Sequence, residues 1–158
     1  RDENQNLVGQ WIDVRTLGEE DRFSADNYVV RGGDADDMPA KQILIATDPT
    51  DVVGQDVQHA VLTESEARRP SLLVTLTDLG GRKMELFSRR HQPDDDGFRR
   101  HLAIIFNGRV YSAPSLNSVM SADIAIEGNF SQAELDPIVN AFRSGTLPCR
   151  VKLVEERW

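Results

Sequence analysis

The fold follows from one stretch, His101-Leu102-Ala103-Ile104-Ile105-Phe106-Asn107-Gly108-Arg109-Val110-Tyr111-Ser112-Ala113-Pro114, in which two β-prone runs flank an Asn-Gly pair. Asn-Gly is favoured in the two-residue type I′ turn, because both central residues of that turn need a positive φ. Pro114 then ends the second run, since it lacks the N–H that a strand donates. The stretch predicts a β-hairpin over about 102–113.

Both faces of this hairpin are largely apolar. Strand alternation predicts that one face carries Leu102, Ile104, Phe106, Tyr111 and Ala113, and the other carries Ala103, Ile105, Val110 and Ser112. Such a hairpin is either covered on both faces, or covers a core with one face and meets a partner with the other. The sequence leaves both alternatives open.

Away from the hairpin, β-rich runs alternate with segments of helical period. We expect strands at about 42–47, 71–77, 124–127 and 150–155, and helices at about 54–62, 80–90 and 131–144. The last helix has a capping box at 131–134 and a stripe of Leu135, Ile138, Val139 and Phe142, with Pro137 predicting a distortion. The pattern favours an α+β fold with a mainly antiparallel sheet and helices packed on it.

Composition is typical of a globular domain: 158 residues, 39% hydrophobic, 28% charged, and a net charge of −8. That balance argues against binding to nucleic acid or to an anionic membrane surface, because both require a basic face. The longest apolar run, 102–106, is far shorter than the roughly 20 residues of a membrane span. The first residue is Arg1 rather than Met and no signal pattern follows it, so we expect a piece of a longer protein from which any targeting segment has been removed.

Residues 1–41 differ in character from residues 42–157. We expect the first part to be an acidic segment with one strand, because 7–14 is apolar and 18–37 holds seven acids against Arg22 and Arg31. A solvated loop is favoured there over a cation site, because a block of like charges is usually exposed chain. The second part carries the orderly pattern and is expected to be the main domain.

No residue pattern of an active site is present. The chain lacks a nucleophile elbow, a phosphate loop, a zinc-protease helix and a dinucleotide glycine motif. His59, His91 and His101 have no partner at metal-ligand spacing, and the single Cys149 excludes a disulfide within the chain. Asp94-Asp95-Asp96 lies between pairs of arginines, which favours a solvated loop with local ion pairs. We expect no catalytic, metal or cofactor site.

Four motifs resemble, in order, the SecD family of the bacterial Sec export machinery. The hairpin stretch is similar to the family's strand, glycine turn and Ser-Ala-Pro; the others are Ile126-Glu127-Gly128-Asn129-Phe130-Ser131, Phe142-Arg143-Ser144-Gly145-Thr146-Leu147-Pro148 and Val154-Glu155-Glu156-Arg157. The resemblance covers about 42–157 and matches the extracytoplasmic P1 domain, in its head-containing part. Two segments depart from the family pattern, at 121–123 and 91–100.

The resemblance implies a non-enzymatic domain on the periplasmic side of the cell membrane that holds or releases preproteins during proton-gradient-driven export. It implies SecF, the Sec channel and unfolded preprotein as partners, and no cofactor. The residues expected to contact preprotein are apolar ones left accessible by the hairpin or its neighbours: Ile105, Val110, Leu116, Val119 and Met120. These side chains would equally serve as ordinary core. Two other hypotheses stay open, a scaffold domain of a membrane assembly without substrate contact and an enzyme.

Overall fold

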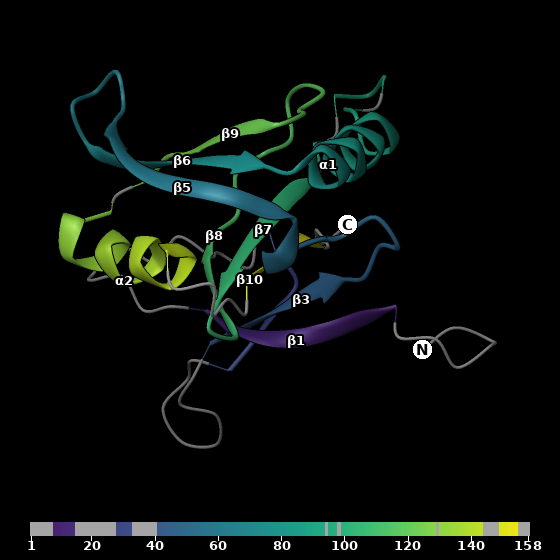
Figure 1. Ribbon diagram of the computed structural model, residues 1–158. Coiled ribbons are helices and arrows are strands. Elements are labelled where there is room, and N and C mark those ends of the chain that lie inside the picture. The colour runs from purple at the N-terminus through teal and green to yellow at the C-terminus, as the bar shows by residue number, and fades with distance from the viewer. Residues whose placement is uncertain are drawn as a thin grey trace.

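The computed structural model describes residues 8–14, 28–32, 41–93, 95–97, 99–128, 130–143 and 149–154, with only the backbone described for the last range. Its described elements are ten strands, two α-helices and one 3₁₀ turn (Figure 1). In chain order they are β1 (Gly9–Val14), β2 (Val30–Arg31), β3 (Gln42–Ala46), β4 (Val52–Val53), η1 (Gly54–Asp56), β5 (Val57–Glu64), β6 (Pro70–Leu76), α1 (Asp78–Arg90), β7 (His101–Phe106), β8 (Arg109–Ser112), β9 (Asp123–Ile126), α2 (Gln132–Arg143) and β10 (Cys149–Val154).

The α+β fold class is confirmed. Helices α1 and α2 and strands β3, β6, β9 and β10 lie where the sequence predicts them, within a few residues at each end. Pro137 lies inside α2, six residues into the helix, as expected. All described strand pairs are antiparallel except β1 with β8.

The hairpin of β7 and β8 is confirmed together with its turn. Asn107 has φ 48° and Gly108 has φ 73°, as a type I′ turn requires. Beyond the turn the pairing shifts by one residue, since Ile105 faces Val110 but Ile104 faces Ser112. This bulge reverses the faces predicted for the end of β8.

The face prediction is therefore wrong for Ser112, which lies opposite Ile104, and for Ala113, which packs with Ala103 rather than with Leu102. Tyr111 occupies the bulge and keeps its predicted face beside Phe106, with the two rings edge-to-face at 5.7 Å. The extra residue explains the change, because each residue inserted into a strand turns every later side chain to the other face.

The larger sheet closes on itself. Its strands pair in the order β2-β3-β1-β8-β7-β10-β4, and β10 also pairs with β3. Strands β3, β1, β8, β7 and β10 therefore form a closed ring, which is a small barrel. Its interior holds one apolar core of buried side chains, from Ile12, Tyr28, Ile43, Ile45, Ala103, Ile105 and Val110.

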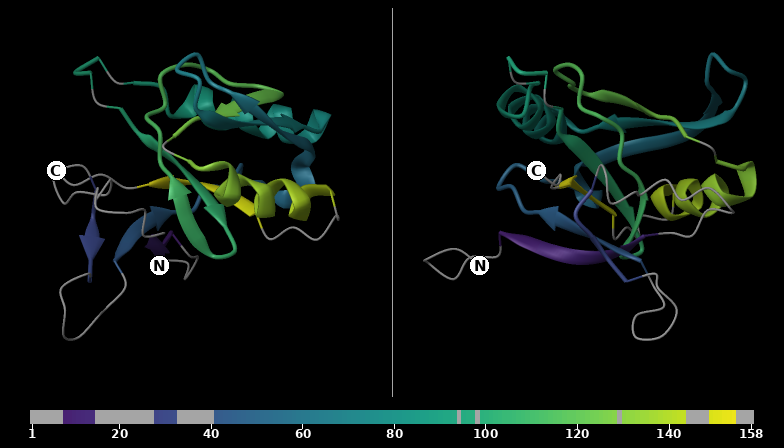
Figure 2. Two further views of the ribbon diagram at one scale, coloured as in Figure 1. Left: turned by 90° about the vertical axis from the view of Figure 1, so that its left-hand side faces the viewer. Right: turned by 180° about the vertical axis from the view of Figure 1, so that it is seen from behind.

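The second apolar core lies between the barrel and a three-stranded sheet of β5, β6 and β9. Helix α2 packs against β5 and β6, and its stripe of Leu135, Ile138 and Val139 is buried there as predicted. The views in Figure 2 place the three-stranded sheet and α1 at one end of the molecule and β1 and β3 at the other. The β7–β8 hairpin is covered on both faces, which settles the alternatives left by the sequence in favour of core.

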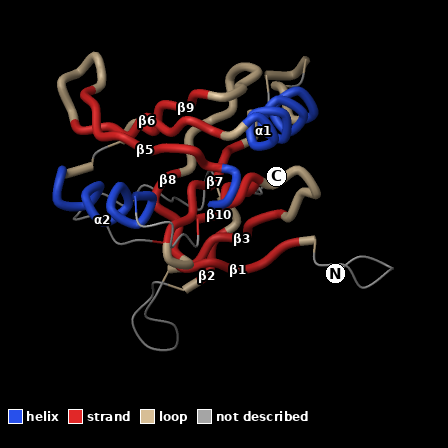
Figure 3. The backbone as a smooth tube through the Cα atoms, in the orientation of Figure 1, coloured by secondary structure: helices blue, strands red, loops and turns tan. Residues whose placement is uncertain are grey.

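The helix predicted at 54–62 is wrong, because this segment is the turn η1 followed by strand β5 (Figure 3). A bulge at Gln58 explains the helical spacing, since Val57 pairs with Leu76 but His59 pairs with Thr75. With one residue inserted between them, Val57 and Ala60 face the same core at a spacing of three. A bulged strand thus reproduces the apolar spacing of a helix.

The division at residue 41 stays a prediction. Strand β1 confirms that part of 7–14 is extended, and both β1 and β2 pair with β3. Most of the acidic stretch at 18–37 lies outside the described residues, apart from 28–32.

Candidate functional site

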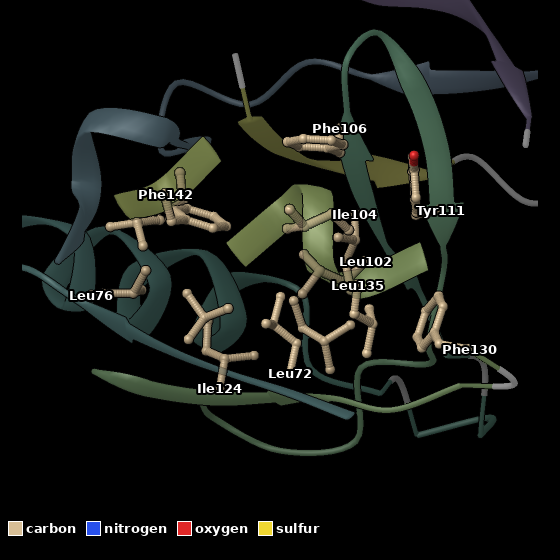
Figure 4. A pocket seen from close by; sticks show the side chains of 15 residues that line it. Leu72, Leu76, Leu102, Ile104, Phe106, Tyr111, Ile124, Phe130, Leu135 and Phe142 are labelled. Carbon is tan, nitrogen blue, oxygen red and sulfur yellow. The ribbon is translucent and has the colours of Figure 1, made fainter. Parts of the chain in front are cut away.

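An apolar cavity of about 40 Å³ lies in the second core, between the three-stranded sheet, α2 and the β7–β8 hairpin (Figure 4). Three sequence periodicities build it. Leu72, Val74 and Leu76 alternate along β6, Leu102, Ile104 and Phe106 alternate along β7, and Leu135, Ile138 and Phe142 follow the helical repeat of α2. The three sets converge on one space that they do not completely fill.

The rim of this cavity is half-buried, whereas its floor is buried. Val57, Tyr111, Ile126 and Phe142 are partly exposed and belong to four different elements. Phe142 and Tyr111 lie at opposite sides of the close view in Figure 4. The lining of the cavity thus reaches the protein surface at these four side chains.

The chemistry of the lining is restricted to apolar contact. Among the described residues that line the cavity, Tyr111 is the only one whose side chain carries a polar atom. An apolar cavity of this kind stays dry and accepts apolar groups rather than water. At about 40 Å³, the site fits a small aliphatic group.

Three of the five residues predicted to contact preprotein are inaccessible. Ile105 and Val110 point into the barrel, and Leu116 is buried in the second core. The prediction that these three are accessible is wrong. For Ile105 and Val110 the sheet closes behind the hairpin and covers the face expected to be free, whereas Leu116 lies after the hairpin and packs into the second core. The sequence does not reveal that β3 pairs with β10, and without that pairing the second face of the hairpin would not be covered.

Val119 and Met120 keep their place as surface candidates. Val119 is 42% exposed, and Met120 is partly buried against the second core. The loop that carries them is fixed to α1, since the Ser88 hydroxyl accepts a hydrogen bond from the Met120 N–H at 3.0 Å. Their contact with preprotein stays a prediction.

The sequence identified only part of this lining. It predicted burial of the α2 stripe, whose Leu135 and Ile138 are buried and whose Phe142 is partly buried, and it left the face of Leu102, Ile104 and Phe106 open between core and partner surface. Nothing in those periodicities distinguishes a filled core from one that leaves space, because the distinction depends on how α2 meets the sheet.

In the described part of the chain, Asp48, in the loop after β3, has a strongly shifted pKa. Burial raises the pKa of its carboxyl, but hydrogen bonds from the Thr50 hydroxyl and N–H, from His91 and from Arg90 outweigh burial and lower the pKa to about 2. Arg90 and His91 end α1, so the ionised Asp48 fastens that helix to the β3–β4 loop. This is a structural ion cluster without a nucleophile.

His101 is the other perturbed group. Burial lowers the pKa of its imidazole, whose ring lies 5.0 Å from that of Tyr28 and whose Nε2 is 3.2 Å from the Ser115 hydroxyl. Among the described residues no group of three His, Cys, Asp or Glu side chains is placed to hold a metal ion.

The arginines beside the aspartate run pair elsewhere. Arg89 bonds to Glu85 at 2.8 Å and Arg90 to Asp48 at 3.0 Å. Asp95 and Asp96 are exposed, and Asp94 lies outside the described residues. The predicted solvated loop agrees with the exposure, while the ion pairs of these two arginines are made with α1 and the β3–β4 loop.

Comparison with known proteins identifies relatives with one common role. Residues 29–149 match the model of the SecDF P1 head subdomain. The chain is 30% identical over 115 residues to the protein translocase subunit SecD of Magnetococcus marinus, covering 72% of this chain and 21% of that protein. It is 33% identical over 110 residues to the protein translocase subunit SecDF of Thermus thermophilus, covering 69% of this chain and 14% of that protein.

Two solved structures agree with these relatives. One, described as the structure and function of a membrane component SecDF that enhances protein export, has a TM-score of 0.54 and 31% identity over 72% of this chain and 49% of that chain. The other, SecDF in the super-membrane-facing form, has a TM-score of 0.51 and 32% identity over 66% of this chain and 14% of that chain.

The chain spans about a fifth or less of the length of the two curated relatives. Neither described α-helix is long and apolar enough to cross a bilayer. From the family model and the curated relatives together, the chain belongs to the SecD/SecDF protein translocase family, of which it is a P1 head subdomain.

Proposed function

We propose that this chain is the extracytoplasmic part of a SecD-type subunit that holds unfolded preproteins weakly during proton-gradient-driven export, without catalysis. Its partners in the complete assembly are the Sec channel and SecF. The observation that carries the proposal is the cavity, because its lining is apolar and its rim is half-buried at Val57, Ile126 and Phe142. Apolar side chains are what an unfolded chain exposes and a folded one hides.

Weak binding suits both the site and the role. A small cavity encloses one side chain rather than a segment, and one buried aliphatic side chain contributes about 1.5–3 kcal/mol. Additional contacts at Val119 and Met120 would lengthen the contact without fixing a sequence. We expect a dissociation constant in the micromolar range or weaker, about −8 kcal/mol or less favourable.

The alternative is a scaffold domain without substrate contact. It is supported by the burial of Ile105, Val110 and Leu116, which shows that most of the apolar surface serves the two cores. The two functions differ in one measurable respect, because only the first requires the domain to bind unfolded polypeptide.

The test is titration of a fluorescently labelled, unfolded preprotein segment against the chain and against Val74→Ile. Val74 lies on the cavity floor, so the added methylene occupies space that the ligand would use. We expect binding to weaken by about tenfold, the usual effect of one methylene group in an apolar pocket. Val61→Ile is the matched control, because Val61 faces solvent on the neighbouring strand.

Two further results bear on the proposal. Val119→Asp should weaken binding severalfold if the loop beside α1 extends the contact. Equal binding by the parent and Val74→Ile would remove the cavity from the mechanism. Absence of binding to the parent at millimolar concentration would favour the scaffold function.

A further inference from the structure

The two α-helices, which lie on opposite sides of the molecule in Figure 1, are held to the fold in different ways. Polar bonds fasten α1 to three other segments. The Lys83 ammonium pairs with Asp56 at 2.8 Å, and the Arg90 guanidinium pairs with Asp48 at 3.0 Å. The Ser88 hydroxyl accepts a hydrogen bond at 3.0 Å from the loop before β9. These directional bonds fix α1 in one position.

Helix α2 has no comparable fastening along residues 135–140. The polar side chains of this stretch belong to Asp136 and Asn140, and within the part of the chain that the structure describes neither side chain forms a hydrogen bond or an ion pair. Leu135, Ile138 and Val139 are buried and hold the stretch by apolar contact. Apolar contact is not directional, so it attaches the helix without fixing its angle to the sheet.

The apolar contact beneath α2 is also incomplete. The cavity of about 40 Å³ lies under this helix, which lines it with Leu135, Ile138 and Phe142 (Figure 4). Side chains that border a void lack the attraction of the atoms that would fill it. An outward movement of α2 therefore gives up less contact than the same movement of a helix on a filled core.

The two ends of α2 differ in how firmly they are held. Its start is anchored, because Phe130 and Leu135 are both buried and the Ser131 N–H donates to the Glu134 carboxylate at 2.7 Å. Its end is less firmly held, because Phe142 is only partly buried. Of the two ends, the C-terminal one is the easier to displace.

Pro137 lies between the anchored start and the looser end. It is the sixth residue of α2 and its ring is exposed, so its effect on the helix acts through the backbone. Proline has no N–H to donate to the Ala133 carbonyl, and its ring crowds that carbonyl. Sharp bends in helices occur at such positions. The helix is thus weakest between its two parts.

We propose that residues 138–143 of α2 are a lid over the cavity, which swings outward about Pro137 while Phe130 and Leu135 stay in the core. In the open state Ile138 and Phe142 leave the cavity, and its floor on β6 and β7 faces solvent. The inference concerns a motion of the chain itself and requires no ligand, so it goes beyond the proposed function and does not depend on it. Local openings of this kind are detected by hydrogen exchange.

The first experiment measures amide hydrogen exchange by NMR in the 158-residue chain without any ligand. After correction for intrinsic rates, we expect the amides of residues 138–143 to exchange at least about tenfold faster than those of residues 84–88 in α1. The reason is that the lid opens while α1 stays fastened.

Pro137→Ala is the variant that tests the hinge, with Asn140→Ala as its matched control. Alanine at 137 supplies the missing N–H and makes the helix continuous. Asn140 is exposed in the same helix, and its replacement raises helix propensity without adding a backbone bond. Relative to the amides of α1, exchange at 138–143 should slow by about tenfold or more in Pro137→Ala and by about threefold or less in Asn140→Ala.

Thiol labelling gives a second readout in a Cys149→Ser background. Ile138→Cys reports on the lid and Leu135→Cys on the anchored start, since both residues are buried and line the same cavity. We expect Ile138→Cys to react with a small thiol reagent at least about tenfold faster than Leu135→Cys. Adding Pro137→Ala should remove most of that difference. Where a cysteine variant does not fold, the amide exchange of the parent decides the question.

Three results would overturn the inference. These are exchange of the amides 138–143 no faster than that of α1, equal slowing by Pro137→Ala and Asn140→Ala, and equal labelling of Ile138→Cys and Leu135→Cys. The last result would mean that α2 moves as one piece or not at all. None of these measurements contains preprotein. Failure of the lid would therefore leave the proposed function standing, and failure of the parent to bind preprotein would leave the lid standing.

Discussion

Lys83 Nζ lies 2.8 and 3.0 Å from the two carboxylate oxygens of Asp56, and this ion pair joins α1 to the turn before β5. The Asp56 side chain is 2% exposed and that of Lys83 is 25% exposed. The Asp56 carboxylate also accepts the Val53 N–H at 2.9 Å, and its carbonyl accepts the Thr77 N–H at 2.8 Å. One residue thus fixes the entry to β5 and the start of α1 together.

Removal of the Asp56 charge should therefore destabilise the fold strongly. Asp56→Asn leaves the Lys83 ammonium without its counterion and weakens the bond to Val53, and breaking a buried pair costs about 3–5 kcal/mol. The Lys83 side chain is partly exposed and can turn to water, so we expect a loss near the lower end, about 3 kcal/mol. Urea denaturation followed by circular dichroism measures it.

The matched comparison is Glu85→Gln, which breaks the exposed pair with Arg89 on the same helix. An exposed pair of this spacing contributes about 0.3–0.5 kcal/mol. Similar losses for the two variants would mean that Asp56 does not hold the helix.

Two adjacent glycines of α1 are expected to respond oppositely to alanine. A Cβ on Gly80 would lie 2.5 Å from the Asp56 carbonyl oxygen, whereas a Cβ on Gly81 would lie 3.5 Å from the nearest atom of Ala122. Gly80→Ala forces apart two backbone segments and should cost about 1–3 kcal/mol. Gly81→Ala fits and should stabilise the helix by up to about 1 kcal/mol. The difference in urea midpoints is the measurement, and equal shifts would contradict the close packing of α1 on η1.

The hairpin was predictable because its information is local. Asn107-Gly108 specifies the turn, and the turn sets the first pairs of β7 with β8. The bulge at Tyr111 was not predictable, because a bulge is chosen by the fit of later side chains into two cores. The error at Ala113 follows directly from it.

The errors at 54–62 and at Ile105 and Val110 have non-local causes. The bulge at Gln58 gives a strand the apolar spacing of a helix, and only the pairing with β6 distinguishes them. Burial of Ile105 and Val110 results from closure of the barrel through β3 and β10, which are separated by about a hundred residues. Family membership was predictable because four motifs occur in order. The cavity was not predictable, because it depends on how α2 packs against the sheet, and the apolar periodicity of the sequence does not specify that packing.

Acid should weaken the fold through Asp48. Its pKa is lowered from 3.8 to about 2 in the folded chain, so the folded state holds fewer protons than the unfolded state between these values. The stabilisation is complete above about pH 4 and is lost as pH falls toward about 2. We expect Asp48→Asn to be less stable than the parent at pH 6 and to converge with it near pH 2.

Urea denaturation over this pH range tests the prediction, with the exposed Asp95→Asn as the control. The control should run parallel to the parent throughout. A constant difference between Asp48→Asn and the parent from pH 6 to pH 2 would show that the ionised carboxylate does not fasten α1 to the β3–β4 loop.

Truncation along the α2 stripe should separate the floor of the cavity from its rim. Leu135 is 1% exposed and its loss leaves a buried void, so Leu135→Ala should cost about 3–5 kcal/mol. Phe142 is only partly buried at the rim, so Phe142→Ala should cost less than the roughly 3–5 kcal/mol of a buried phenylalanine, even though its side chain is larger. Preprotein binding should show the opposite order. Phe142→Ala removes part of the cavity's entrance and should weaken binding more than Leu135→Ala, which enlarges the cavity. Urea denaturation and fluorescence titration of both folded variants measure the two effects, and a Phe142→Ala variant that loses more stability than Leu135→Ala but binds normally would place the entrance elsewhere.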